Sequence, residues 1–221
     1  MTVIAVLLTF SSGATDVASF TRLGDVFASV MTGNMVLLGL SLARGSVSLA
    51  SHTTVAIAGY VLGVAAGTRV AWFHSTRTNS DPDANSPWPP HITLTFLLQF
   101  LLLAGVAAGW EITGSRPGGA TQFVMLAATS CAMGIQSSAV NDMGLKEVST
   151  TYLTGTLTGL VGALAHPARR AGFRRGGVLL GLACGALLAG IFVAYVPDLV
   201  PAPPLGALVA VIILGSRVAI T

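Results

Sequence analysis

Eight long apolar stretches constrain the fold of this 221-residue chain more than any other feature. They are Val3–Phe20, Val26–Ala43, Thr53–Phe73, Ile92–Trp110, Ala120–Val140, Ser149–Ala165, Val178–Val196 and Leu205–Ile220. All ten prolines fall between the stretches, and this supports helical structure because proline interrupts helical hydrogen bonding. Repeated unbroken apolar segments of this length indicate a protein that crosses a membrane several times as helices.

The composition excludes most other classes of protein. Charged residues make up 9% of the chain, whereas a soluble domain carries about a quarter. A spanning β-barrel would alternate apolar and polar residues, and the apolar runs here are unbroken. The two cysteines, Cys131 and Cys184, lie inside apolar stretches with no disulfide or metal-site spacing. We therefore expect an all-α integral membrane protein, a helical bundle forming one membrane domain over residues 1–221.

Paired motifs indicate that the bundle consists of two repeated halves. Met31–Asn34 (Met-Thr-Gly-Asn) stands opposite Leu153–Thr156 (Leu-Thr-Gly-Thr) at an offset of 122 residues. The same offset relates Gly59 to Gly181 and Gly63 to Gly185, and an offset of 121 relates Gly13 to Gly134. We predict a first half at 1–110, a second half at 119–221 and a polar loop at 75–91. Internal repeats are typical of transporter folds.

The two short stretches, Val26–Ala43 and Ser149–Ala165, decide how the halves run in the membrane. Each reaches only about 25 Å as a helix, which is less than the ~30 Å hydrocarbon core. If both are re-entrant, the chain has six full spans and inverted halves, with 8 basic residues inside and 3 outside. If both cross, it has eight spans and parallel halves, and the count is 7 against 4. We favour six spans, and both alternatives place the C-terminus in the cytoplasm.

One carboxylate, Asp16, lies well inside an apolar stretch. A charge at that depth costs at least ~2.5–3.5 kcal/mol, so it needs a partner or a function. It shares one helical face with polar or small residues, which are Thr9, Ser12, Gly13 and Ser19. The corresponding helix of the second half carries Ser130, Gly134, Gln136, Ser137 and Asn141. Both stripes should face the bundle interior, either as one asymmetric site or as interhelical hydrogen bonds.

The two Thr-Gly motifs offer a second kind of site. We predict that Asp25 caps a helix beginning near Val26, and that Ser149 caps its counterpart. Helix N-termini that meet at mid-membrane would present free N–H groups to an anion or a carboxylate. The alternative is that the threonines bond their own helices and the glycines permit tight packing.

These features favour a small secondary transporter of a small anionic solute, coupled to protons through Asp16. The candidate substrate-binding residues are Asp16, Thr32, Gly33, Asn34, Gln136, Thr154, Gly155 and Thr156. The alternatives are a structural or regulatory membrane protein and, less favoured, a membrane-embedded enzyme. We expect no enzymatic activity, cofactor or metal, since no HExxH, P-loop or buried nucleophile–histidine set occurs.

The motifs also resemble a known family. Phe10–Phe20 and Val30–Asn34 are similar to the YoaK family, in which a Gly-x-x-Asp motif precedes a Thr-Gly-Asn motif. Gly13, Asp16, Thr32, Gly33 and Asn34 match those motifs, and Met133–Gln136 and Ser149–Thr156 also follow the family pattern. The resemblance implies a multi-pass protein of the bacterial inner membrane and brings no substrate.

The expected partners follow from the same features. They are the lipid bilayer and a small-molecule solute, and the chain is compatible with a homodimer. The basic cluster Arg169, Arg170, Arg174 and Arg175 indicates a cytoplasmic loop rather than a nucleic-acid site.

Overall fold

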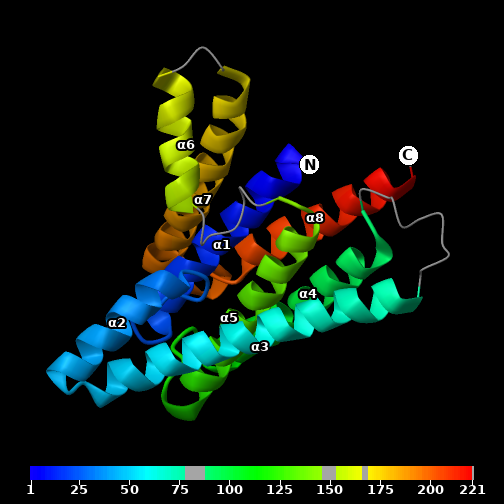
Figure 1. Ribbon diagram of the computed structural model, residues 1–221. Coiled ribbons are helices and arrows are strands. Elements are labelled where there is room, and N and C mark those ends of the chain that lie inside the picture. The colour runs from blue at the N-terminus through cyan, green and yellow to red at the C-terminus, as the bar shows by residue number, and fades with distance from the viewer. Residues whose placement is uncertain (78–87, 146–152, 166–168, 221) are drawn as a thin grey trace.

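The computed structural model describes residues 1–77, 88–145, 153–165 and 169–220, and its regular structure there is entirely helical (Figure 1). The helices are α1 (Thr2–Arg22), α2 (Met31–Arg44), α3 (Val47–Arg77), α4 (Pro90–Ile112), α5 (Gly119–Asp142), α6 (Leu153–Ala165), α7 (Arg169–Tyr195) and α8 (Ala202–Ile220), with the short 3-10 helix η4 (Pro197–Leu199) before α8. The predicted all-α class is confirmed.

Six of the described helices are long and apolar enough to cross a membrane. They are α1, α3, α4, α5, α7 and α8, the last counted from the start of η4, and their apolar parts contain 21 to 27 residues. At about 1.5 Å per residue each reaches at least ~30 Å, the thickness of the hydrocarbon core. The other two, α2 with 14 residues and α6 with 13, reach only about 20 Å. The lengths therefore agree with six spans and two short segments rather than with eight spans.

Helices α1 and α5 form the centre of the bundle. Their apolar windows are 61% and 67% buried, against 22–33% for the other four long helices. Helix α1 packs mainly against α7 and α8, and α5 packs mainly against α3 and α4. Large apolar side chains on the outer helices face outward, among them Leu62, Leu101 and Leu187. The polar residues of the α1 stripe are buried, as predicted, whereas the α5 stripe is buried at Ser130 and Gln136 and exposed at Asn141, near the end of the helix.

Glycine allows two of these helix pairs to cross with their backbones in contact. A Cβ atom at Gly13 of α1 would overlap the Leu182 carbonyl oxygen of α7. A Cβ atom at Gly134 of α5 would likewise overlap the Tyr60 carbonyl oxygen of α3. The partner helices contribute close-contact glycines of their own, which are Gly59 and Gly63 in α3 and Gly181 and Gly185 in α7. Small residues at such crossings are how helices associate in lipid.

The short helices extend from the bundle at different places. Helix α2 lies along the first part of α3, and α6 lies along the first part of α7 (Figure 1). Figure 1 also shows the N- and C-termini at the same end of the bundle, as an even number of spans requires.

Two predicted boundaries change in the structure. The stretch Val26–Ala43 is helical only from Met31, because residues 23–30 form a loop. The predicted polar loop at 75–91 is shorter, since α3 continues to Arg77 and α4 begins at Pro90. The predicted halves meet between α4, which ends at Ile112, and α5, which begins at Gly119.

Candidate functional site

The Asp16 carboxylate binds a loop that runs back beside α1. Asp16 lies six residues before the end of α1 and is 7% exposed. Its Oδ1 accepts a hydrogen bond from the Ser29 backbone N–H at 2.8 Å, and its Oδ2 accepts one from the Ser29 hydroxyl at 2.5 Å. Hydrogen bonds to a carboxylate are stronger than bonds between neutral groups, and they offset the cost of burying the charge.

We refer to residues Leu23–Val30 as the entry loop. This loop follows the end of α1 and runs back along the helix until Ser29 lies beside Asp16. Four of its residues are buried, namely Leu23, Val26, Ala28 and Ser29. The chain reverses at Gly24 and Asp25, which have φ values of +105° and +59°. The His52 ring lies against Gly24, and an added Cβ there would overlap it. Only glycine fits both this backbone conformation and this contact.

The predicted helix cap at Asp25 is wrong. Asp25 is exposed and belongs to the reversal, and α2 begins only after Val30. Val30 is the N-cap residue of α2 and provides no side-chain cap. The apolar composition of residues 26–30 suggested helix because a buried loop and a buried helix both require apolar side chains. The corresponding prediction for Ser149 lies outside the described residues.

Asn34 holds the other side of the entry loop. Its Oδ1 accepts the Phe27 backbone N–H at 3.0 Å, and its Nδ2 donates to the Phe27 carbonyl at 2.6 Å. The side chain is fully buried, so both bonds are shielded from water and lipid. The Asn34 amide thus provides hydrogen-bond partners for both the backbone N–H and the backbone carbonyl of Phe27, which lies outside the helices.

Thr32 and Gly33, the other two residues of the Thr-Gly-Asn motif, do not hold the entry loop as Asn34 does. Thr32 is exposed on α2, and Gly33 faces the Phe27 ring, which an added Cβ would approach to 3.3 Å. The structure therefore brings two candidate residues, Asp16 and Asn34, to one loop, where each binds backbone.

Gln136 belongs to a separate polar cluster at the centre of the bundle. Its Nε2 donates to the Ser12 hydroxyl at 2.9 Å and to the Leu8 carbonyl at 3.2 Å. Its Oε1 accepts from Nε2 of Gln99 in α4 at 2.8 Å. The cluster joins α1, α4 and α5, and all three polar side chains are buried.

Gln99 is a residue that the sequence analysis missed. Its Oε1 is buried without a hydrogen-bond partner in the described part of the chain. The available signal was a lone amide in the middle of α4, which is otherwise the apolar stretch Ile92–Trp110. An intramembrane polar residue of this kind usually faces the bundle interior.

The candidate residues of the second half lie on α6. Thr154 and Gly155 are exposed, and Thr156 is buried. Helix α6 packs mainly against α7, where Nη1 of Arg175 donates to the Gly159 carbonyl at 2.8 Å. Among the hydrogen bonds of the described residues, none joins Thr154 to Asp16 or Asn34.

This arrangement defines a class: a multi-pass α-helical membrane protein with polar groups held between its spans. The comparisons with known proteins agree. The chain belongs to the family described as "Protein of unknown function (DUF1275)", whose model matches residues 4–214. It is 30% identical over 181 residues to the "UPF0700 transmembrane protein YoaK" of Bacillus subtilis (strain 168), covering 80% of this chain and 75% of that protein. The predicted resemblance to the YoaK family is confirmed. No solved structure matches the chain.

Proposed function

We propose that this protein is a small secondary transporter that couples movement of a small solute to protons. The observation that carries the proposal is the pair of hydrogen bonds from Ser29 to Asp16. An ionisable group inside a span is a functional candidate by default, and here it holds a loop that interrupts the membrane segment. Protonation would remove the carboxylate's charge and occupy one of its acceptor sites, thereby weakening its hold on the loop.

The helix crossings support two repeated halves. Gly13 meets Leu182 and Gly134 meets Tyr60, and these contacts are related by the offsets of the sequence repeat, 121 and 122 residues. Helices α1–α4 then correspond to α5–α8. Each half has three long helices. Because three spans bring the chain to the other side of the membrane, the second half starts on the side opposite to the start of the first half. The proposal is therefore an inverted repeat in which α2 and α6 are re-entrant.

Charge distribution supports the orientation. With six spans, 8 basic residues lie on the side of the two termini and 3 on the other side. By the positive-inside rule, this orientation places both termini in the cytoplasm. The bacterial inner membrane is what the resemblance to the YoaK family implies.

The solute class rests on the start of α2. This helix begins without a side-chain cap, and although the Met31 N–H donates to the Ser29 carbonyl at 3.1 Å, the N–H groups of Thr32 and Gly33 are left for an anion. Asp16, the Thr-Gly motifs and Gln136 stay the candidate binding residues, and they lie in separate places: Asp16 and Asn34 at the entry loop, Gln136 in the central cluster and Thr154 exposed on α6. We propose neither catalysis nor a cofactor. A homodimer stays a prediction from sequence.

A structural or regulatory role is the second candidate. Both Asp16 and Asn34 are bonded to backbone groups, as they would be if the motifs served only to hold the entry loop.

Transport can be tested in proteoliposomes that contain a pH-sensitive dye. Small organic anions such as acetate and lactate, and inorganic phosphate, are applied one at a time across the membrane. We expect at least one anion to drive proton movement into liposomes that contain the wild type, but not into liposomes that contain Asp16→Asn. This substitution keeps one oxygen that can accept a bond from Ser29. Thr154→Val should weaken solute binding at every pH, by about 0.5–1.5 kcal/mol. The structural role is favoured instead if Asp16→Asn unfolds the protein while Thr154→Val behaves as the wild type.

A further inference from the structure

A chain of hydrogen bonds through His52 joins α1, α3 and α5 at the end of the bundle where the entry loop begins. Nδ1 of His52 in α3 lies 2.8 Å from the Ser48 carbonyl oxygen, and its Nε2 lies 3.2 Å from Oε1 of Gln122 in α5. Nε2 of Gln122 donates to the carbonyl of Arg22, the last residue of α1, at 2.9 Å. We refer to these four residues as the His52 chain. It shares no residue with the hydrogen bonds of the entry loop described above.

The His52 ring has little freedom to move. It is 7% exposed, and it stacks on the Phe123 ring of α5 with 4.2 Å between the ring centroids. Gly24, where the chain reverses, lies so close to it that an added Cβ would overlap the ring. His52 therefore connects α5 to the start of the entry loop, and its hydrogen bonds are shielded from water.

The His52 chain fits only one protonation state of its histidine. The backbone carbonyls of Ser48 and Arg22, at its two ends, can only accept, so its three contacts need three donated protons. The Gln122 amide donates across one of its two contacts and accepts across the other, whichever way it is turned. A neutral imidazole donates one proton and the imidazolium donates two. Only the imidazolium therefore completes all three hydrogen bonds, and a neutral ring leaves two acceptors facing each other.

No charged side chain of the described residues bonds to the His52 ring. The segment packed against the ring carries two charged residues, Arg22 and Asp25. The Arg22 guanidinium donates to the Val193 carbonyl of α7 at 3.3 Å, and Asp25 is exposed. The first two turns of α3 and of α5 contain no charged residue. The other charged side chains at this end of the bundle are exposed, namely Arg44, Glu111, Arg116 and Asp198. The hydrogen bonds of the ring thus decide which protonation state fits.

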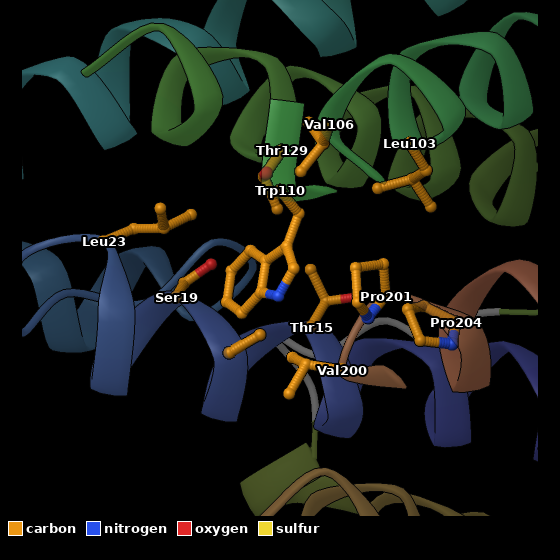
Figure 2. A pocket seen from close by; sticks show the side chains of 11 residues that line it. Thr15, Ser19, Leu23, Leu103, Val106, Trp110, Thr129, Val200, Pro201 and Pro204 are labelled. Atoms are coloured by element: carbon orange, nitrogen blue, oxygen red, sulfur yellow. The ribbon is translucent and has the colours of Figure 1, made fainter. Parts of the chain in front are cut away.

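Packing alone does not fix this end of the entry loop. Leu23, the first residue of the loop, borders a cavity of about 30 Å³, and Figure 2 shows Leu23 and Ser19 there with the Trp110 ring. The cavity can hold a water molecule, which would give the buried Ser19 hydroxyl the partner that it lacks in the described part of the chain. Because side chains beside a cavity lose packing contacts, the attachment here depends more on the His52 chain.

We propose that His52 is a pH-sensitive latch, which as an imidazolium holds the end of α1 and the start of the entry loop against α3 and α5. Loss of one ring proton breaks one hydrogen bond of the His52 chain, and histidine loses this proton between about pH 5 and 8. The hold is therefore complete at low pH and weakens as the pH rises. Asp16, at the other end of the loop, responds in the opposite sense, since an ionised carboxylate binds Ser29 more strongly. The latch concerns the conformation of the loop and does not depend on transport.

Hydrogen–deuterium exchange of the purified protein tests the latch. Protection factors of the entry-loop amides are measured by mass spectrometry at about pH 5.5 and about pH 8, on either side of the histidine range. Between these values the wild type should lose about three- to tenfold protection relative to His52→Gln, since one hydrogen bond is lost. His52→Gln keeps Asp16, so the comparison isolates the histidine. The control His91→Gln, at the start of α4, should respond as the wild type does.

Gln122→Leu distinguishes the latch from a histidine that is merely buried. It leaves His52 able to titrate but removes the acceptor at Nε2, so a neutral ring bonded to Ser48 is then sufficient. Protection should be lower than in the wild type at both pH values, and the pH response should match that of His52→Gln. If Gln122→Leu does not fold, Gln122→Asn provides a second test, because its shorter amide cannot reach both partners. A wild-type response equal to that of His52→Gln, or one that persists in a folded Gln122 variant, would overturn the proposal.

Discussion

Asp16 and Ser29 are joined by two hydrogen bonds across 13 residues, and this pair fixes how deeply the chain returns into the bundle after α1. Ser29 contributes both its backbone N–H and its hydroxyl, so a single residue satisfies both carboxylate oxygens. The intramembrane charge and the break between α1 and α2 are thus explained by one contact.

This contact predicts the effect of Ser29→Ala. The substitution leaves the backbone bond to Oδ1 and removes the hydroxyl bond to Oδ2, so the free energy of unfolding should fall by about 1.5–3 kcal/mol. Unfolding in mixed micelles with increasing denaturing detergent measures the change. Ser51→Ala is the control, because that exposed hydroxyl bonds only the Ser48 carbonyl of its own helix, and it should change stability by less than about 0.5 kcal/mol. Equal effects of the two substitutions would contradict the assignment.

Asn34 allows a matched comparison within one motif. Asn34→Asp keeps an oxygen for the Phe27 N–H but places a carboxylate against the Phe27 carbonyl, where the amide had donated. We expect a loss of about 2 kcal/mol or more, since a buried charge is left unpaired. Thr32→Ala, two residues away and exposed, should be nearly neutral. Thermal unfolding in detergent compares the two, and a stable Asn34→Asp protein would show that the amide donor is dispensable.

The close helix crossings predict opposite effects for the same substitution at two helical glycines. Gly63→Ala places a Cβ on the Cys131 carbonyl oxygen, so α3 and α5 must separate, at a cost of about 1–3 kcal/mol. Gly105 has nothing within 4 Å of an added Cβ, and Gly105→Ala should stabilise the protein by up to about 1 kcal/mol through helix propensity. The midpoints of thermal unfolding should move in opposite directions. A stabilised Gly63→Ala protein would be inconsistent with backbone contact at this crossing.

The glutamine cluster predicts non-additive stability. Gln136→Leu removes the acceptor of Gln99 Nε2 and the donor to Ser12 and Leu8, whereas Gln99→Leu removes one bond along with an oxygen that is already unpaired. The first substitution should therefore cost more, by about 1 kcal/mol or more. The double variant should be less destabilised than the sum of the two single changes, by roughly 0.5–3 kcal/mol. Strict additivity in this double-mutant cycle would mean that the two side chains do not interact.

The orientation proposal predicts where topology reporters lie. Six spans and inverted halves place a reporter after Arg44 outside and one after Pro167 inside the cell. Labelling of single introduced cysteines by an impermeant thiol reagent distinguishes the sides, in a background where Cys131 and Cys184 are replaced by serine. Finding both positions on the cytoplasmic side would reject inversion and restore the eight-span alternative.

Much of the fold was predictable because it depends on local composition. The six long helices follow from apolar stretches of sufficient length, and the burial of Asp16 follows from the cost of a charge in lipid. The spacing of Gly59 and Gly63, four residues apart, is typical of helices that pack closely in lipid, and both glycines lie at such a crossing. The entry loop was not predictable in the same way, since the apolar side chains of Val26 and Ala28 suit a buried loop as well as a helix.

The sequence by itself determined that the chain resides in a membrane, how many of its segments can cross, and which polar residues must turn inward. All three depend on how much apolar or polar surface a short segment carries, and lipid imposes that requirement whatever the neighbours are. Only the tertiary structure decided that Asp16 meets Ser29, that Asn34 meets Phe27, and that Ser19 is left without a partner beside Trp110. Hydrogen bonds act over about 3 Å, so partners are fixed only when the helices have packed and the chain has turned at Gly24 and Asp25.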